Sequence, residues 1–570
     1  MTDKNTLNLP TPRWWRHRLW SVAALGIAAL VVMPIAAIAV MALFPQENIW
    51  PHLVSTVLPR YLGNSVLLVV LVGTLAGAAG TGAAWLLTMY SFPGSRWLSW
   101  AVLLPLAIPA YVGAYALVDF LEYAGPVQTA LRQMFGWQSA RDYWFFQVRS
   151  PGAAVVVLAS ALYPYVYLLV RSALNEQSAS AFEVSRALGA GPWRQFWSVG
   201  IPLARPAIAA SVAIVMMETV SDFGAVSYFA VQTLTTGIFA TWLDGGNAGG
   251  AAQIASLILL VVLVLVGLEK RNRARLRFFQ SPRQSRPVTQ IHLHGWRGWL
   301  VFAACFLPFG LGFVLPGAVI LGHAIDNARG WLDPGLLLAL RNTIFVGATA
   351  AIATVTAALV LTYGVRLSGQ RLPALVLPAT TIGYAAPGAV LGVGLLIPMS
   401  NFDHLLADFI TSMTGRDPGL LLTGTAFAII YAYCVRFFAV AQGAMDAALG
   451  RIPPSLPMAA RSLGQSNAGV LRHVTVPMIR GSVATALLLV FVDCVKELPA
   501  TLLLRPFNFN TLSTRVYEKA SLEQIGQAAP AAVLVSLVGL FAVLMLARTN
   551  PSMRVLRRAQ KSPKPRRVPL

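Results

Sequence analysis

The stretch EVSRALGAGPWRQFWSVGIP, residues 183–202, separates two long apolar segments and is unlike either of them. Gly189 suits the left-handed position that ends a helix, and the dipeptide Gly191-Pro192 turns the chain. Two tryptophans and a phenylalanine follow at one-turn spacing, which gives a face that fits the headgroup layer of a membrane. Pro202 then ends the segment. We therefore predict a rigid helical elbow beside a membrane surface and call it the first elbow.

A related stretch, MAARSLGQSNAGVLRHVTVP, occupies residues 458–477 and is called the second elbow. The two elbows share an Arg-x-Leu-Gly core and a final Val-x-x-Pro. Gly464 and Pro477 each follow their counterparts in the first elbow by 275 positions. Chance similarity between apolar helices is common, but polar residues in a shared register are not. The pattern therefore predicts an internal duplication.

The chain around the elbows has the composition of a membrane protein. Of its 570 residues, 56% are hydrophobic and 11% are charged, whereas a soluble domain carries about 25% charged residues. Apolar runs long enough to cross a bilayer recur about twelve times. They lie near 19–43, 66–90, 97–118, 152–172, 206–226, 250–268, 298–321, 343–365, 373–398, 421–441, 480–501 and 530–547. The predicted fold class is an all-α polytopic membrane protein.

Basic residues gather in three places and predict the orientation of the chain. They cluster before the first span, between 270 and 297, and from 548 to 567. The positive-inside rule places all three clusters in the cytoplasm, so each half needs an even number of spans. Six plus six spans satisfy that requirement and give two repeats of the same orientation. The loops assigned to the other side carry acids instead: Asp119, Glu122, Asp326, Asp333, Asp403 and Asp408.

These features divide the chain into four parts. They are 1–268, a first six-helix repeat with its N-terminal cytoplasmic segment; 269–297, a basic cytoplasmic linker; 298–549, a second six-helix repeat; and 550–570, a basic cytoplasmic tail. Membrane topology and attraction to anionic lipid explain the net charge of +22. A nucleic-acid partner is therefore not expected.

The first elbow resembles the EAA loop of binding-protein-dependent ABC transporter permeases, which reads Glu, five residues, Gly, nine residues, then Val-x-Ile-Pro. In that family the loop forms a coupling helix that sits in a groove of the ATPase subunit. The resemblance implies the type I ABC importer permease fold and a set of coupling residues in each elbow. These are Glu183, Arg186, Ala187, Gly189 and Pro202, and Ala459, Ala460, Arg461, Gly464 and Pro477. The second elbow departs from the family pattern, because Met458 stands where the family has glutamate.

Residues 217–242 and 492–520 resemble the fused two-domain permeases of the iron(III) uptake group, most specifically in KELPATLLLRPFNF at 496–509. The resemblance implies a translocation subunit of a bacterial inner membrane that imports ferric iron from a periplasmic binding protein. Related permeases carry thiamine, polyamines, sulfate or phosphonates, so the cargo stays open.

ATP hydrolysis is expected from a separate subunit, in two copies for the two elbows. A phosphate-binding loop needs a Gly-Lys step, and no lysine in this sequence follows a glycine. We therefore expect no enzymatic activity and no cofactor in this chain. An ion-coupled secondary carrier is the main alternative, since such carriers also have six plus six spans, but it leaves the paired elbows unexplained. A membrane enzyme finds no support in a metal-spaced cluster of His, Asp and Glu.

Ionisable residues within the apolar runs are candidates for the translocation path. Glu218 and Asp222 are spaced i, i+4, as are Asp493 and Glu497, so each pair would share a helix face, and Lys496 can neutralise Asp493. An ionised group inside a bilayer costs about 2.5–3.5 kcal/mol, so such residues usually face an interior or a water-filled cavity. Two interpretations stay open. The acids line the path and hold a ferric cation in passing, without a stable metal site, or they make structural contacts.

Prolines interrupt two of the apolar runs. Pro105 and Pro109 are expected to break one span, and Pro378 and Pro387 its counterpart. Such breaks are tolerated where neighbouring helices or a cavity satisfy the backbone. They would act as hinges or as simple kinks.

Overall fold

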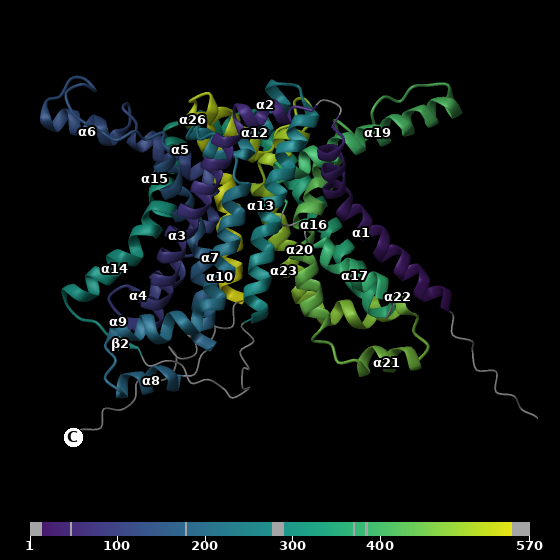
Figure 1. Cartoon of the computed structure of the whole chain (residues 1–570), viewed down its shortest axis with the longest axis horizontal. Helices are drawn as coiled ribbons and strands as arrows, with labels where there is room; N and C mark the ends of the chain where they lie inside the picture. Colours follow the sequence, from purple (N-terminus) through teal and green to yellow (C-terminus); the bar gives the residue numbers. More distant parts are fainter. Residues whose placement is uncertain are drawn as a thin grey trace, which may run out of the picture.

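The computed structural model describes residues 14–45, 48–176, 179–275, 290–368, 371–381, 383 and 386–549. Within these residues, eleven helices are long and apolar enough to cross a membrane, or twelve when one bent pair counts as a single span. The predicted all-α polytopic fold is confirmed, and Figure 1 shows the long helices running between two ends of the molecule. The basic N-terminal residues before Trp14, half of the linker and the C-terminal tail lie outside the described residues.

The long helices form two sets of six spans. The first half contributes α1 (Trp14–Leu43), α3 (Leu58–Met89), α4 (Ser95–Ala101) with α5 (Ala110–Leu121), α7 (Pro151–Glu176), α10 (Ile201–Ser221) and α13 (Ala248–Arg275). The second half contributes α14 (Trp296–Phe309) with α15 (Leu315–Asp326), α16 (Pro334–Ser368), α17 (Arg371–Thr380) with α19 (Gly388–Thr414), α20 (Ala426–Leu449), α23 (Val476–Lys496) and α26 (Ile525–Thr549).

Short elements connect these spans. The short α-helices are α2 (Trp50–Ser55), α6 (Pro126–Phe135), α8 (Ala179–Ala187), α9 (Pro192–Gln195), α11 (Gly224–Tyr228), α12 (Leu234–Phe239), α21 (Ser455–Ser462), α22 (Asn467–Val470), α24 (Pro499–Leu504) and α25 (Leu512–Ser521). Two 3₁₀ turns, η1 (Leu104–Ala107) and η5 (Ala328–Leu332), and four π-helical turns, η2 (Phe196–Gly200), η3 (Ala240–Asp244), η4 (Gly310–Val314) and η6 (Leu471–Thr475), complete the helical set. The strands β1 (Tyr90–Ser91) and β2 (Ile291–His292) pair in parallel and join the end of the linker to the end of α3.

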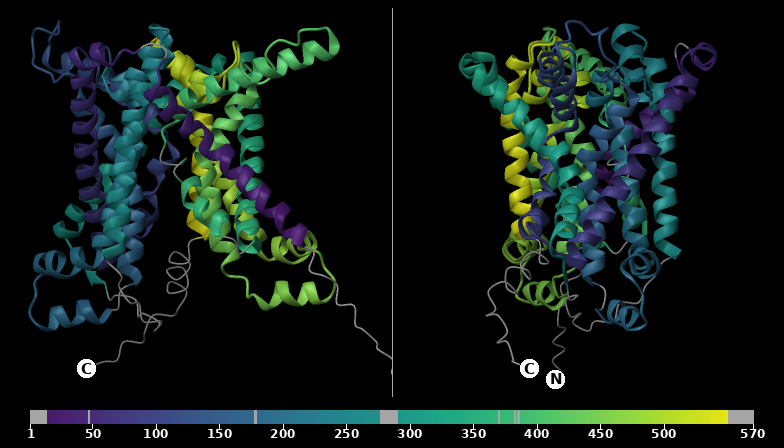
Figure 2. Two further views of the ribbon diagram at one scale, coloured as in Figure 1. Left: turned by 45° about the vertical axis from the view of Figure 1, so that its right-hand side comes forward. Right: turned by 90° about the vertical axis from the view of Figure 1, so that its left-hand side faces the viewer.

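Each half sends its first helix across to the other half. Helix α1 packs on α16 and α19, and the hydroxyl of Tyr431 in α20 donates to the carbonyl oxygen of Leu30 in α1 at 2.8 Å. Helices α14 and α15 pack on α3 and α5, where His323 Nε2 lies 2.7 Å from Asp119 Oδ2. Figures 1 and 2 show α1 lying obliquely over the helices of the second half. The two halves are therefore interlocked.

Matching hydrogen bonds confirm the predicted duplication. The amide of Asn64 in α3 donates to the carbonyl oxygen of Gln232 at 2.8 Å, and that of Asn342 in α16 donates to the carbonyl oxygen of Asn510 at 3.0 Å. Both members of the second pair follow the first by 278 positions. In each half the residue after the acceptor is a threonine that starts a short helix with a reciprocal capping box.

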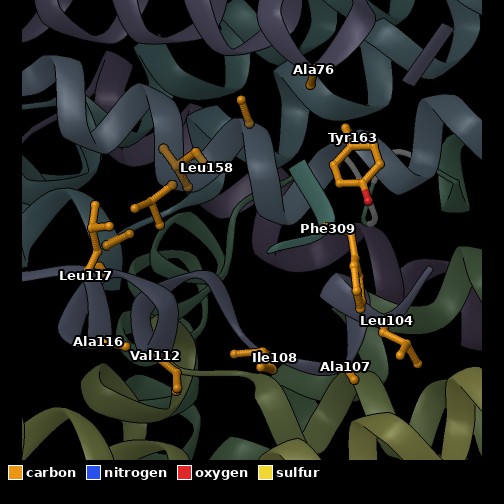
Figure 3. Close-up of a cluster of buried hydrophobic side chains, with 14 of the residues drawn as sticks. Ala76, Leu104, Ala107, Ile108, Val112, Ala116, Leu117, Leu158, Tyr163 and Phe309 are labelled. Atoms are coloured by element: carbon orange, nitrogen blue, oxygen red, sulfur yellow. The ribbon is translucent and has the colours of Figure 1, made fainter. Parts of the chain in front are cut away.

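Small residues allow close approach of the helices. A Cβ atom added at Gly80 of α3 would lie 2.7 Å from the carbonyl oxygen of Tyr163 and 2.6 Å from the Cβ of Val166 in α7. Lipid gives helices little hydrophobic reason to associate, so such van der Waals contact supplies much of the stability. Figure 3 shows part of this core, which includes Ala76 of α3 together with Leu158 and Tyr163 of α7.

The span predicted at 97–118 is broken, as its prolines suggested. Helix α4 gives way to η1, and α5 begins after Pro109, with a 95° bend between the two helical parts. In the second half, α19 begins after Pro387, as predicted, but the prediction that Pro378 also breaks the span is wrong, because Pro378 lies inside α17. A proline lacks the N–H that an uninterrupted helix needs, so in both spans the helix restarts after a proline.

Four acids that we assigned to loops lie in helices instead. Asp119 is in α5, Asp326 ends α15, and Asp403 and Asp408 lie in α19. The helices extend beyond the apolar runs, so their final segments carry charge. Asp403 is fully buried, and its carboxylate accepts the backbone N–H groups of residues 421–423 at 2.7–2.9 Å.

The close contact at Gly80 generates a prediction about stability. Gly80→Ala should lower the free energy of unfolding by about 1–3 kcal/mol, because the added methyl group overpacks the contact between α3 and α7. Gly82→Ala on the same helix is the matched control, since a Cβ there meets nothing within 4 Å. Thermal unfolding in one detergent, followed by tryptophan fluorescence, measures the difference. Equal melting temperatures for the two variants would contradict the packing argument.

Candidate functional site

The first elbow has the predicted helix–turn–helix geometry. Helix α8 ends in a Schellman motif, in which the N–H of Ala190 donates to the carbonyl oxygen of Ser185 at 3.0 Å and Gly189 N–H to that of Arg186 at 2.9 Å. Gly189 has φ +79°, which confirms its left-handed role. Helix α9 then begins with Pro192 in its first turn.

The second elbow repeats this geometry. Helix α21 ends with a donation from Gln465 N–H to the carbonyl oxygen of Ala460 at 3.1 Å and from Gly464 N–H to that of Arg461 at 3.0 Å. Gly464 has φ +85°. Figures 1 and 2 show α8 and α21 at the same end of the molecule, which we call the elbow end.

An aromatic residue fastens each elbow to the end of a long helix. Trp85 near the end of α3 packs edge-on against Phe182 and Phe196, with ring centroids 5.9 and 5.3 Å apart. Near the end of α16, the hydroxyl of Tyr363 donates to the carbonyl oxygen of Asn467 at 2.9 Å. Trp85 and Tyr363 are 278 positions apart, the offset of the paired asparagines. Our sequence analysis missed them; a large aromatic residue closing an apolar run was the available indication.

Most of the predicted coupling residues face solvent. The exposed ones are Glu183, Ala187, Gly189, Ala459, Arg461, Gly464 and Pro477, and the partly buried ones are Arg186, Ala460 and Pro202. Met458, which replaces the glutamate of the family pattern, is 59% exposed. Each elbow thus exposes small residues together with a large apolar side chain, Leu188 in the first and Leu463 in the second, at the elbow end.

The prediction that Pro202 ends the first elbow is wrong. Residues 192–221 form one continuous helical segment, and Pro202 lies in the first turn of α10. The π-helical turns η2 and η6 immediately precede Pro202 and its counterpart Pro477. A π-helical turn changes which carbonyl each N–H reaches, so it lets the helix continue past a residue that has no N–H.

The prediction that each acidic pair shares a helix face is also wrong. Asp222 follows the end of α10 with ψ 134°, and its Oδ1 accepts the N–H groups of Ala225 and Val226 at 3.0 and 3.1 Å. Glu497 follows the end of α23 with ψ 124°, and its Oε1 accepts the N–H of Ala500 at 2.9 Å. Each carboxylate has left its helix to satisfy the backbone of the next one, α11 or α24.

The other two acids face a shared cavity. Glu218 from α10 and Asp493 from α23, again 275 positions apart, both line a cavity of about 160 Å³. Among the described side chains, Arg436 is the main positive charge that acts on Glu218, and Lys496 is the main one that acts on Asp493. The two halves therefore place equivalent carboxylates around one space.

Two cationic side chains complete this cluster. The ammonium of Lys496 donates to the carbonyl oxygen of Leu106 in η1 at 2.9 Å. In α20, Arg436 Nε lies 3.4 Å from Glu497 Oε2, and both side chains are largely buried. Our sequence analysis did not single out Arg436, although an arginine in the apolar run at 431–440 was itself an indication. We call the space lined by these charges the charged chamber.

The charged chamber is built by both halves of the chain. Backbone donors and ion pairing offset the cost of burying its charges in the bundle. A polar space of this kind is suited to the passage of an ion or a polar solute between the halves.

Comparison with known proteins shows similarity to transport permeases. The family described as "Binding-protein-dependent transport system inner membrane component" matches residues 70–278. The chain is 28% identical over 498 residues to the Fe(3+)-transport system permease protein FbpB 2 of Haemophilus influenzae, which covers 85% of this chain and 89% of that protein.

Other relatives carry different names. The ferric transport system permease protein FbpB of Actinobacillus pleuropneumoniae is 23% identical over 83% of this chain and 69% of its own length. The molybdenum transport system permease protein ModB of Escherichia coli is 28% identical over 32% of this chain and 79% of its own length. Residues 70–278 of this multi-pass membrane chain are therefore similar to the family of binding-protein-dependent transport system inner membrane components.

Proposed function

We propose that the chain is the translocation subunit of an ATP-driven importer whose cargo is ferric iron. The observation that carries the proposal is the pair of equivalent elbows at one end of the molecule, each with a left-handed glycine and an exposed surface. Similarity to ferric permeases over 85% of the chain supports the choice of cargo.

The partners follow from the two elbows. One copy of a cytoplasmic ATPase subunit binds at each elbow, and a periplasmic binding protein delivers cargo at the opposite end. The elbow end and both termini then lie in the cytoplasm, and the protein resides in a bacterial inner membrane. The chain itself holds no cofactor and hydrolyses no ATP.

The charged chamber is the proposed route of the cargo. Four carboxylates and two cationic side chains line its cavities: Glu218, Asp222, Asp493, Glu497, Lys496 and Arg436. The formal excess of negative charge favours a cation over the oxyanions that molybdenum and sulfate permeases carry. Oxygen ligands also suit a hard trivalent ion.

Charge at the elbow glycines should uncouple the ATPase. A Cβ at Gly189 or Gly464 points into open space, so Gly189→Asp and Gly464→Asp project a carboxylate towards the partner. Both variants also place a side chain at positive φ, a strain that the control variants share. We expect each variant to lower ATP hydrolysis stimulated by loaded binding protein about fivefold or more, a loss of roughly 1–3 kcal/mol of coupling. The measurement is ATPase activity in nanodiscs.

Gly136→Asp and Gly415→Asp are the matched controls for this experiment. Both glycines end helices with φ +70° and open space at Cβ, but at the end opposite the elbows. Their ATPase coupling should equal that of wild type. Unchanged coupling in the elbow variants would make the elbows mere connectors and would favour a secondary carrier.

The cargo is tested with the complete transporter in proteoliposomes. Ferric-loaded binding protein should stimulate ATP hydrolysis and iron accumulation, whereas molybdate-loaded or thiamine-loaded binding proteins should do neither. Stimulation by molybdate alone would reassign the cargo. Uptake driven by an ion gradient in the absence of ATPase would refute the ATP-driven mechanism.

A further inference from the structure

The charged chamber comprises two cavities that share part of their lining. The cavity nearer the elbow end is lined by Ile214 of α10, one turn before Glu218, and by Met217, the residue directly before it. The other, also about 160 Å³, is lined by the chain that follows α10, including Phe223 and Gly224, and by η1. The residues common to both cavities are Tyr165, Glu218, Ser221, Arg436, Lys496 and Glu497.

Arg436 belongs to this shared lining, which we call the shared layer. It projects from α20 to the carboxylate of Glu497 at the end of α23, and the two side chains are 14% and 4% exposed. The first residue of α19 packs against the ion pair, because a Cβ at Gly388 would lie 2.6 Å from an Nη of Arg436. The absence of a side chain at position 388, directly after Pro387, thus leaves room for the guanidinium.

Lys496 closes the same layer towards the first half. Its ammonium holds the carbonyl oxygen of Leu106 in η1, the broken segment that lines the cavity farther from the elbows. The layer therefore ties α20, α23 and η1 together through two cations. Arg436 and Lys496 thus occupy the positions from which a transported cation would approach the carboxylate of Glu497 and the carbonyl oxygen of Leu106.

We propose that Arg436 is the gate of the pathway, a tethered cation that seals the layer between the two cavities and that cargo must displace from Glu497. The proposal rests on the proposed function, since it takes the charged chamber as the route. Because the seal is an ion pair, an arriving cation can replace the guanidinium at the carboxylate. An oxyanion cannot, so Arg436 contributes to selectivity as well as to closure.

The test measures passive leak, which needs neither ATPase nor cargo delivery. The full-length chain is reconstituted in liposomes with entrapped calcein, and quenching by external Co²⁺ reports entry of cations. Arg436→Met removes the guanidinium and should raise the quenching rate about tenfold or more over wild type. Arg436→Lys keeps a cation at the gate and should stay close to wild type. Arg366→Met, which breaks the ion pair of Arg366 with Asp446 outside the chamber, is the control and should not leak.

A second variant separates gating from folding. Glu497→Gln removes the charge, but its amide oxygen still accepts the N–H of Ala500, so the start of α24 is preserved. It should leak as Arg436→Met does. Loss of the buried ion pair is expected to lower the melting temperature, so leak is compared at a temperature well below the melting point of each variant. The gate is refuted if both variants are as tight as wild type, or if Arg436→Lys leaks as much as Arg436→Met.

The outcomes also separate the gate from the proposed function. Leak through Arg436→Met in a protein that never imports iron with its ATPase would support the gate and refute the importer. ATP-driven iron import by wild type together with a tight Arg436→Met variant would support the importer and refute the gate.

Discussion

A helix that breaks inside a bilayer leaves backbone N–H groups that lipid cannot satisfy, and the rest of this structure depends on how the chain meets that constraint. Asp222 and Glu497 each follow a long helix and accept the N–H groups that open the next short one. Carboxylates placed for this purpose bring charge into the bundle. Charge in turn requires counter-ions or a polar cavity, and the chamber supplies both through Arg436, Lys496 and the surrounding space.

The duplication produces this arrangement twice, but the two halves have diverged. Both acids cap a helix, whereas the described contacts pair only Glu497 with an arginine side chain from a neighbouring helix. The elbows also differ in charge, since the second elbow has Met458 at the position where the first has Glu183. A single chain that contains both repeats can carry such differences, because each half always meets the same partner. A homodimer of one repeat would have to place the same residue on both sides.

The sequence predicted the parts of the structure that local chemistry determines. A glycine that needs positive φ, such as Gly189 or Gly464, ends its helix in any context, and apolar length alone marks the spans. The sequence misled where distant segments decide. Pro202 was predicted to end its segment, but a π-helical turn lets the helix continue. The i, i+4 spacing of Glu218 and Asp222 predicted a shared helix face, but the next helix needs Asp222 as a hydrogen-bond acceptor. Arg436 joins the chamber only because α20 packs against α23, a contact that no short pattern encodes.

Because the helix continues through Pro202, it links the elbow physically to the charged chamber. Residues 192–221 and 467–496 are each a helical segment of 30 residues, which at 1.5 Å per residue is about 45 Å long. One end of each segment is an elbow helix, and the other end carries Glu218 or Asp493 and then a helix-capping carboxylate. We infer that a displacement of an elbow moves the chamber as a lever would, because a packed helix transmits movement with little loss. The π-helical turns near the elbows are the weakest points of these levers, so bending there would be expected to dissipate the movement before it reaches Arg436.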